Sequence, residues 1–246
     1  MNELRGLFVV GTDTGVGKTR VAAAIARSAF VAGRRVGVLK PLATGCVRRG
    51  ESWQCEDTDL LIEAVGGGIA AERVTPLAFS EPLAPSVAAR RAGAPLEHSR
   101  VERLVREALA WWALRAELMV VEGVGGLLCP LTEGTTVADL AVALDYPLLI
   151  VARRGLGTLN HTLMTVEAAF WRGLRVAGIV LNSALPEADP LASSTNAEEL
   201  ARRLPGVAIL AEVEYQAEPA SISTLPGSLD WCGLARTPRR IDGKIS

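Results

Sequence analysis

The sequence contains very little lysine. Only three of its 26 lysine and arginine residues are lysine, namely Lys18, Lys40 and Lys244. Positive and negative charges nearly balance, giving a net charge of −1. A chain without a basic excess is not expected to bind nucleic acid, because such binding needs cations to offset the phosphates. The few lysines are therefore candidate functional groups.

Other reactive residues are also scarce. The sequence has only two histidines, which excludes a multi-histidine metal centre. Its four cysteines, Cys46, Cys55, Cys129 and Cys232, form neither a CxxC pair nor a metal-ligand spacing, so we expect reduced thiols. No apolar run approaches the ~18 residues of a membrane span, and the N-terminus lacks a signal-peptide pattern. These absences predict a cytoplasmic protein with no membrane partner.

Apolar runs alternate with helix-like segments along most of the chain. The runs, which are rich in Val, Ile and Leu, are Leu7–Val10, Val36–Leu39, Leu118–Val121, Leu148–Val151 and Val176–Leu181. The helix-like segments are Thr19–Ala32, Glu97–Leu114, Thr158–Trp171 and Ala197–Leu204. Continuous apolar runs suit parallel strands that are covered on both faces. The alternation predicts an α/β fold of three layers, with a mostly parallel sheet flanked by helices.

The chain has no Gly/Ser-rich or Pro-rich linker, so we predict one domain over residues 1–246. The region from Gly45 to Pro95 is less regular and is expected to carry loops over the sheet edge. From about Tyr215 onwards the sequence is rich in Pro, Gly, Ser and Arg. This tail is expected to be weakly structured.

A phosphate-binding loop is the clearest motif. The run Leu7–Val10 leads into Gly-Thr-Asp-Thr-Gly-Val-Gly-Lys-Thr at residues 11–19, and a helix pattern follows. This is G-x-x-x-x-G-K-[ST] in the strand–loop–helix context that the motif requires. The glycines let backbone N–H groups surround phosphate oxygens, and the helix N-terminus adds its positive dipole end. Lys18 is expected to reach the β- and γ-phosphates of ATP, and Thr19 to bind Mg²⁺.

Further charged residues follow the other predicted strands. Lys40 ends the second apolar run, and Glu122 ends the third, just before a glycine-rich turn. The carboxyl ends of parallel strands meet at one crevice, where Lys40 could hold a small anion and Glu122 could reach Mg²⁺. A third acid could come from Asp57 or Asp59, although either residue could instead cap a helix.

Together these residues resemble the dethiobiotin synthetase family, the ATP-dependent ligases of biotin synthesis. The matching segments occur in family order at residues 11–19, 40–45, 81–85, 121–126, 156–161 and 178–182. The phosphate loop alone is common to many ATPases. The combination of Lys-Pro-Leu-Ala-Thr-Gly, Val-Glu-Gly-Val-Gly-Gly and Leu-Gly-Thr-Leu-Asn-His is much more specific.

The resemblance implies a P-loop synthetase that uses 7,8-diaminononanoate, CO₂ and ATP with Mg²⁺. One amine takes up CO₂ as a carbamate, ATP phosphorylates the carbamate, and the second amine closes the ureido ring. The family is homodimeric, with substrate bound near the dimer interface. The expected partners are therefore small molecules and a second copy of the chain.

The resemblance also implies roles for individual residues. The catalytic residues would be Lys18, Lys40 and Thr14. Mg²⁺ would be held by Thr19, Asp57 and Glu122, because the family spacing selects Asp57 over Asp59. ATP would be bound by Gly15, Val16, Gly17, Lys18, Thr19, Arg20, Asp57, Glu122, Gly123, Val124, Gly125, Asn182, Glu214, Tyr215 and Gln216. The substrate would be bound by Lys40, Thr44, Gly126, Gly157, Thr158, Leu159 and Asn160, the last four at a predicted helix N-terminus that receives a carboxylate across the dimer.

Two other functions fit a phosphate loop. A ParA/MinD-like ATPase switch would carry a second lysine early in the loop, where this chain has Gly11-Thr12-Asp13-Thr14. An amide synthetase acting on a corrin acid would carry an additional glutaminase domain, for which we expect no room. One departure from the family pattern is Ala211–Gln216, where relatives often have Gly-Glu-Ile-Pro, and it bears on nucleotide selectivity.

Overall fold

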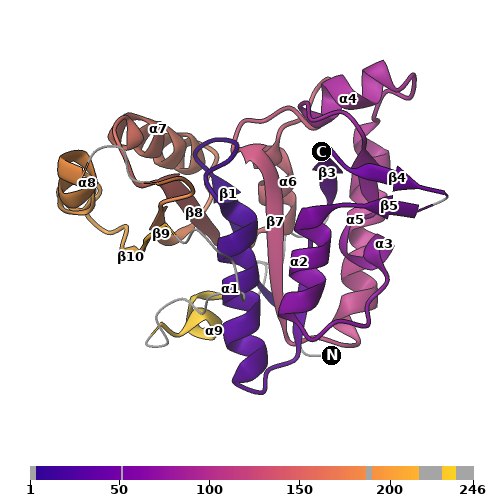
Figure 1. Ribbon diagram of the computed structural model, residues 1–246, viewed down its shortest axis with the longest axis horizontal. Helices are drawn as coiled ribbons and strands as arrows, with labels where there is room; N and C mark the ends of the chain where they lie inside the picture. The colour runs from indigo at the N-terminus through magenta and orange to yellow at the C-terminus, as the bar shows by residue number, and fades with distance from the viewer. Residues whose placement is uncertain (1–3, 51, 187–189, 216–228, 237–246) are drawn as a thin grey trace.

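The structure is a computed structural model that describes residues 4–50, 52–186, 190–215 and 229–236 (Figure 1). Its centre is a six-stranded sheet in the order β10-β9-β8-β1-β7-β2, with parallel neighbours throughout. The strands are β1 (Arg5–Gly11), β2 (Val36–Leu39), β7 (Leu118–Gly126), β8 (Leu148–Arg153), β9 (Val176–Asn182) and β10 (Ile209–Val213).

Helices cover both faces of this sheet (Figure 1). The longer ones are α1 (Lys18–Val31), α2 (Glu56–Ala64), α5 (His98–Ala113), α6 (Val137–Leu144), α7 (Thr158–Trp171) and α8 (Pro190–Arg203). The predicted three-layer α/β fold is therefore confirmed. None of the described helices is both long and apolar enough to cross a membrane.

The chain order places a crevice at the end of β1. This strand lies between β7 on one side and β8 on the other. The chain moves from β1 to β2 at one sheet edge and later returns to β8 on the opposite side of β1. Ligands of open α/β sheets bind beyond the carboxyl ends of the strands at such a reversal. The phosphate loop after β1 and the glycine-rich end of β7 therefore face each other.

The hydrophobic core extends on both sides of the sheet. Leu7, Val9 and Val10 of β1 are fully buried, although they alternate between the two faces of the strand. The small side chains of α1 allow close packing against the sheet, and Ala22, Ala23 and Ala26 are also fully buried. Burial on both faces explains why the strands appear in the sequence as continuous apolar runs.

The region from Gly45 to Pro95 is more regular than predicted. Besides α2 it contains α3 (Ala71–Val74), α4 (Pro85–Arg91), β6 (Leu77–Phe79) and the hairpin of β4 (Val47–Arg49) and β5 (Ser52–Gln54). Strand β6 pairs in parallel with β3 (Leu42–Thr44). The region has loops as expected, but the prediction missed these elements because most of them are too short to show a periodic pattern.

Two other expectations also need correction. Residues 229–236, within the tail predicted to be weakly structured, include α9 (Trp231–Leu234) with a buried Trp231. Arg236 forms an antiparallel bridge with Gly6 of β1. In addition, α8 begins at Pro190 rather than at Ala197, because its first turns carry polar residues that do not read as an amphipathic helix.

The prediction that all four cysteines are reduced is wrong for one pair. Cys46 and Cys55 are joined by a disulfide, with 4.7 Å between their Cα atoms. The β4–β5 hairpin folds the chain back and brings these two residues together. No motif in the sequence predicts this pairing. Cys129 and Cys232 are free thiols.

Candidate active site

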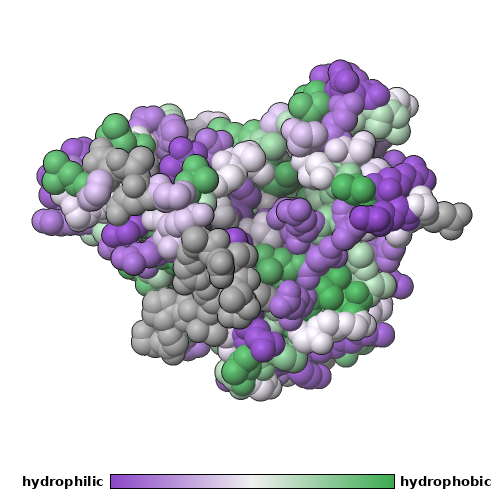
Figure 2. Space-filling view, in the orientation of Figure 1, coloured by the Kyte–Doolittle hydropathy of each residue, from purple (hydrophilic) through white to green (hydrophobic). Residues whose placement is uncertain are grey.

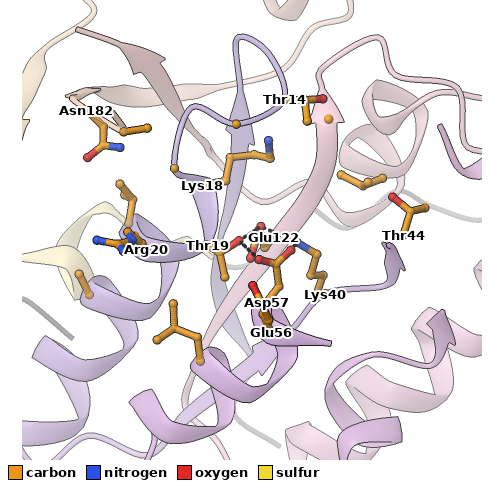
Figure 3. Close-up of a pocket in the computed structure, with 18 of the residues that line it drawn as sticks. Thr14, Lys18, Thr19, Arg20, Lys40, Thr44, Glu56, Asp57, Glu122 and Asn182 are labelled. Atoms are coloured by element: carbon orange, nitrogen blue, oxygen red, sulfur yellow. Dashed lines mark hydrogen bonds and ion pairs between the residues drawn. The ribbon is translucent and has the colours of Figure 1, made fainter. Parts of the chain in front are cut away.

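A cleft of about 970 Å³ opens at the carboxyl ends of the central strands. Its floor is formed by the phosphate loop, the start of α1 and the ends of β7 and β9 (Figure 3). The first turn of α2 and the residues just before α4 form another wall. The lining includes Lys18, Thr19, Lys40, Asp57 and Glu122, so residues far apart in sequence share one space.

The phosphate loop is held by backbone and side-chain contacts. The N–H of Thr12 donates to the carbonyl of Val151 on β8 at 3.0 Å. The N–H of Thr14 donates to Oδ1 of Asp13 at 2.7 Å, which closes a local turn. The Lys18 ammonium donates to the carbonyl of Asp13 across the loop at 3.1 Å. These contacts fix the loop against β8 and within itself.

Gly17 and Asn182 fit closely against each other. Gly17 has a φ of 90° and precedes α1 as its N-cap residue. A Cβ atom at this position would lie 2.1 Å from Nδ2 of Asn182. The same Nδ2 atom donates to the carbonyl of Val16 at 2.8 Å. Only glycine fits here, both for its backbone angle and for this contact.

Two carboxylates, a hydroxyl and an ammonium meet at the centre of the cleft (Figure 3). The Thr19 hydroxyl lies 2.8 Å from Oδ1 of Asp57 and 2.8 Å from Oε1 of Glu122. The Lys40 ammonium donates to the same Oε1 atom at 2.8 Å and also to Oδ2 of Asp57. The side chain of Lys40 is 5% exposed and that of Glu122 is 0% exposed. Lys40 and Glu122 are thus paired away from water, whereas the side chain of Asp57 is 46% exposed.

The pKa values reflect this pairing. Burial alone would lower the pKa of Lys40, but Glu122 and Asp57 outweigh it and the net shift is upward. Burial would raise the pKa of Asp57, but Lys40 and Thr19 outweigh it and the net shift is downward. For Lys18, burial dominates and lowers the pKa, although the nearby carboxylates oppose it. Lys40 and Asp57 therefore both remain charged at neutral pH.

The oxygen cluster is chemically suited to Mg²⁺. Oε2 of Glu122 is buried and has no hydrogen-bond partner among the described residues. Together with the Asp57 carboxylate and the Thr19 hydroxyl it offers hard oxygen ligands, which Mg²⁺ prefers. Within the described part of the chain, no group of three or more His, Cys, Asp and Glu residues could hold a metal alone. Two carboxylates and one hydroxyl are typical of Mg²⁺ sites whose other ligands are phosphates and water.

The structure distinguishes the two candidate aspartates. Asp57 lies in the first turn of α2 and points into the cluster, whereas Asp59 is exposed in the same turn. Neither residue caps the helix, because the N-cap position is occupied by Cys55. The alternative interpretation of these aspartates as helix caps is therefore wrong.

Other predicted site residues divide into two groups. Thr14, Gly15, Arg20, Thr44, Val124, Gly125, Glu214 and Tyr215 line the cleft. Val16, Gly123 and Gly126 are not among the lining residues, although they adjoin it in sequence. Gln216 lies outside the described residues.

The predicted substrate-carboxylate residues lie elsewhere in this chain. Gly157, Thr158, Leu159 and Asn160 form the N-terminal end of α7, and none of them lines the cleft. Gly157 and Asn160 are exposed, whereas Thr158 is 2% exposed.

Sequence reasoning did not assign several lining residues. They are Val21, Ala24, Glu56, Leu60, Glu63, Pro82, Leu83, Ala84, Cys129, Ser183, Ala184 and Val213. The segment Glu81–Pro85 was noticed as a motif but was given no role. Ser183 follows Asn182 directly, so extending each strand-end motif by one residue would have found it.

The fold and the cleft define a P-loop ATPase. A ParA family ATPase from Chlorobium tepidum TLS matches 87% of this chain and 85% of its own, with a TM-score of 0.50 and 16% identity. At this identity the likeness concerns the fold alone. Residues 5–221 also match a family model described as an AAA domain.

Curated relatives define the family more narrowly. The chain is 50% identical to ATP-dependent dethiobiotin synthetase BioD of Anaeromyxobacter dehalogenans (strain 2CP-C), over 81% of this chain and 85% of that protein. It is 40% identical to the protein of the same name from Pseudomonas paraeruginosa, over 80% of this chain and 85% of that protein. The chain belongs to the ATP-dependent dethiobiotin synthetase family.

Proposed function

We propose that this protein converts 7,8-diaminononanoate, CO₂ and ATP into dethiobiotin, ADP and phosphate, with Mg²⁺ as cofactor. The observation that carries the proposal is the position of Lys40. Its buried ammonium lies between Asp57 and Glu122, in the cleft that also contains the phosphate-loop residues Lys18 and Thr19. A carbamate attacking a γ-phosphoryl group brings several negative charges together, and buried cations stabilise that arrangement.

ATP binds to the phosphate loop in this proposal. Lys18 exchanges its contact with the Asp13 carbonyl for the β- and γ-phosphate oxygens. The N–H groups of the loop and the start of α1 surround the remaining oxygens. Asn182 keeps its side-chain carbonyl for the amino group of adenine, because its amide nitrogen is engaged with Val16. Glu214 and Tyr215 line the same end of the cleft.

Thr19, Asp57 and Glu122 are the residues that would hold Mg²⁺. The ion, when bound with ATP, neutralises charge on the β- and γ-phosphates. The same two carboxylates are the partners of Lys40. Lys40 lies within reach of this site and pairs with the carbamate oxygen and the transferring phosphoryl group. Thr14 and Thr44 line the cleft and orient the carbamate and the amine.

The two bond-forming steps then depend on correct placement of the reacting groups. The carbamate oxygen attacks the γ-phosphorus of ATP and ADP leaves. The second amine attacks the carbamoyl carbon and expels phosphate, which closes the five-membered urea. Both steps are favoured by holding the two amines of the substrate at fixed positions.

We further propose that the working unit is a homodimer in the cytoplasm. Leu156, Trp171 and Leu191 are 80%, 87% and 76% exposed. They lie on or next to α7 and α8, where Figure 2 shows hydrophobic side chains among polar ones. Burial of these residues against a second copy would carry the α7 N-terminus to the neighbouring cleft. Gly157, Thr158, Leu159 and Asn160 of one copy would then bind the carboxylate of the substrate held by the other.

Product formation tests the proposal directly. Purified protein should form dethiobiotin and phosphate only when 7,8-diaminononanoate, bicarbonate, Mg²⁺ and ATP are all present. The proposal includes no nucleic-acid or membrane partner. Phosphate release that is stimulated by DNA or lipid vesicles and does not need the diamine would contradict it.

A further inference from the structure

The Cys46–Cys55 disulfide joins two walls of the cleft. Cys46 follows Thr44 by two residues, and its N–H donates to the carbonyl of Phe79 on β6 at 3.0 Å. Cys55 is the N-cap residue of α2 and precedes Asp57 by two residues. The bond therefore ties the first turn of α2 to the paired strands β3 and β6.

We propose that this disulfide is a redox modification site, at which reversible reduction by a dithiol loosens the first turn of α2 and weakens binding of Mg²⁺ and ATP. The thiol chemistry rests on the proposed cytoplasmic location and not on the proposed reaction, whereas its effect on Mg²⁺ and ATP rests on that reaction. Disulfides in cytoplasmic proteins are usually transient and redox-sensing rather than structural. A disulfide beside an active-site carboxylate fits that use.

The rest of α2 does not depend on the disulfide. Leu61 and Ala64 are fully buried in the following turns, and the hydroxyls of Thr58 and Thr75 form a buried hydrogen bond of 2.7 Å that holds the end of the first turn. Reduction would therefore leave the helix in place and release only its start. Within the first turn, Asp57 is the residue that contacts Lys40 and Thr19.

The bond lies under a thin cover. Cys46 is 4% exposed and Cys55 is 6% exposed, and they pack against Ala43 with Trp53 and Ala78 partly buried beside them. The hairpin above them is exposed, including Val47 at 58%. Opening of this short hairpin would admit a small dithiol to the sulfur atoms.

Reduction of the Cys46–Cys55 bond proceeds by thiol–disulfide exchange. A thiolate of the dithiol attacks one sulfur, the Cys46–Cys55 bond breaks, and a mixed disulfide forms. The second thiol of the reagent then displaces the protein sulfur. The dithiol loses two electrons and two protons and becomes a disulfide, while the protein gains both as two thiols.

Alkylation and mass measurement test the site itself. Protein purified in air without reductant is denatured and treated with iodoacetamide, then digested and mapped. We expect modification of Cys129 and Cys232 only, and of all four cysteines after dithiothreitol. Modification of Cys46 and Cys55 before reduction would overturn the proposal.

A second measurement tests the consequence. Hydrogen exchange over residues 56–64 and binding of a non-hydrolysable ATP analogue with Mg²⁺ are compared for oxidised and reduced protein. We expect faster exchange in the first turn of α2 and binding weaker by about tenfold, at the lower end for loss of a group that orients a metal ligand. Equal exchange and equal binding in both forms would refute the proposed effect.

The variants separate this bond from the other thiols. The double variant Cys46→Ala, Cys55→Ala should match the reduced protein and should not respond to dithiothreitol, since alanine neither forms the bond nor caps the helix start. Cys232→Ser, which changes a free thiol outside the cleft, should respond as the natural sequence does. A response of the double variant would assign the effect to another thiol. Faster exchange without dethiobiotin synthesis would refute the proposed function and leave the redox site standing.

Discussion

At the scale of single residues, the site is dominated by a buried pair of opposite charges. Lys40 is 4% exposed and Glu122 is 1% exposed, and their atoms are 2.8 Å apart. Removing one partner of such a pair typically costs 3–5 kcal/mol, roughly, because the other charge stays buried and unpaired. A test of the role of Lys40 must therefore separate stability from catalysis.

The variant Lys40→Arg separates the effect of Lys40 on stability from its effect on catalysis. The guanidinium keeps the positive charge but replaces a compact ammonium with a planar fork. We expect thermal unfolding near that of the natural sequence, retained ATP binding and a loss of kcat by about 10²–10³, the size expected for a misplaced transition-state cation. Lys40→Gln should lose turnover and also stability. Lys18→Gln should instead weaken nucleotide binding. Near-normal ring closure in Lys40→Gln would refute the assigned role.

Gly17→Ala tests the contact between the phosphate loop and β9. A methyl group here would lie 2.1 Å from Nδ2 of Asn182, and the φ of 90° strains any residue with a side chain. We expect ATP binding to fall below detection in calorimetry at micromolar protein while the fold persists. Gly134→Ala is the matched control, because a Cβ there meets nothing within 4 Å. Unchanged ATP affinity in Gly17→Ala would show that the loop adapts.

At the scale of elements, α2 is the least conventional part of the site. Phosphate-loop proteins commonly take their metal-binding acid from a strand of the central sheet, as with Glu122 of β7 here. Asp57 comes instead from the first turn of a helix outside the central sheet. The helix is therefore held to the sheet partly by the charge of Asp57, and its anchoring depends on pH.

Asp57→Asn should remove that dependence. The pKa of Asp57 is lowered from its ordinary value of 3.8 mainly because Lys40 outweighs the effect of burial. Its ionised form therefore stabilises the fold fully above pH 3.8, and this stabilisation is lost as the pH falls further. Lys40 has a raised pKa, so its contribution persists below its ordinary value of 10.5 and is lost as the pH rises beyond it.

Denaturant unfolding of the two proteins between pH 7 and pH 3 measures the effect. We expect the difference in free energy of unfolding to be largest at pH 5–7 and to shrink toward pH 3. Asp59→Asn, in the same turn but exposed, should show no such trend. A difference that stays constant down to pH 3 would mean that Asp57 does not titrate against Lys40.

The elements that could be predicted are those with a strong local pattern. A buried parallel strand appears as an apolar run, and a longer helix-like segment lies between such runs. For this reason β2 and α7 were predicted with their observed bounds. Strand β10 was missed because it is a short edge strand with an exposed Glu212. Helix α6 was missed because five of its residues are buried and it lacks a polar face.

The same distinction applies to the site. Motifs predicted that Lys18, Lys40 and Glu122 share one crevice. The structure brings them together from the start of α1, the residue after β2 and the middle of β7. The disulfide and the choice between Asp57 and Asp59 depend on how the β4–β5 hairpin and α2 fold back over the sheet. Tertiary packing sets these separations, so the residues alone left the disulfide unseen and both aspartates open, and only the family spacing favoured Asp57.

At the scale of the whole molecule, the chain has its candidate residues in two separate places. Lys40 lies in the cleft, and Asn160 lies on the exposed end of α7 outside it. A two-fold dimer, the commonest symmetric assembly, makes any contact between these places reciprocal. Each active site would then take Lys40 from one chain and Asn160 from its partner.

Complementation tests this arrangement. Lys40→Gln and Asn160→Ala chains should each be nearly inactive at low diamine concentration. After unfolding and refolding of an equal mixture, half of the dimers are mixed, and each has one site with both natural residues. We expect about a quarter of the natural activity in the mixture. No recovery in mixed dimers confirmed by native mass measurement would mean that both residues act within one chain.

The burial of Lys18 and Lys40 has a consequence for chemical labelling. Arginine does not react with acylating reagents, and arginine supplies nearly all the other cations of this chain. An ATP analogue that carries an acyl phosphate would deliver its acyl group next to these two amines, which free reagent reaches poorly at 7% and 4% exposure. Labelling at residues 18 and 40 would therefore report occupancy of the nucleotide site against an almost silent background.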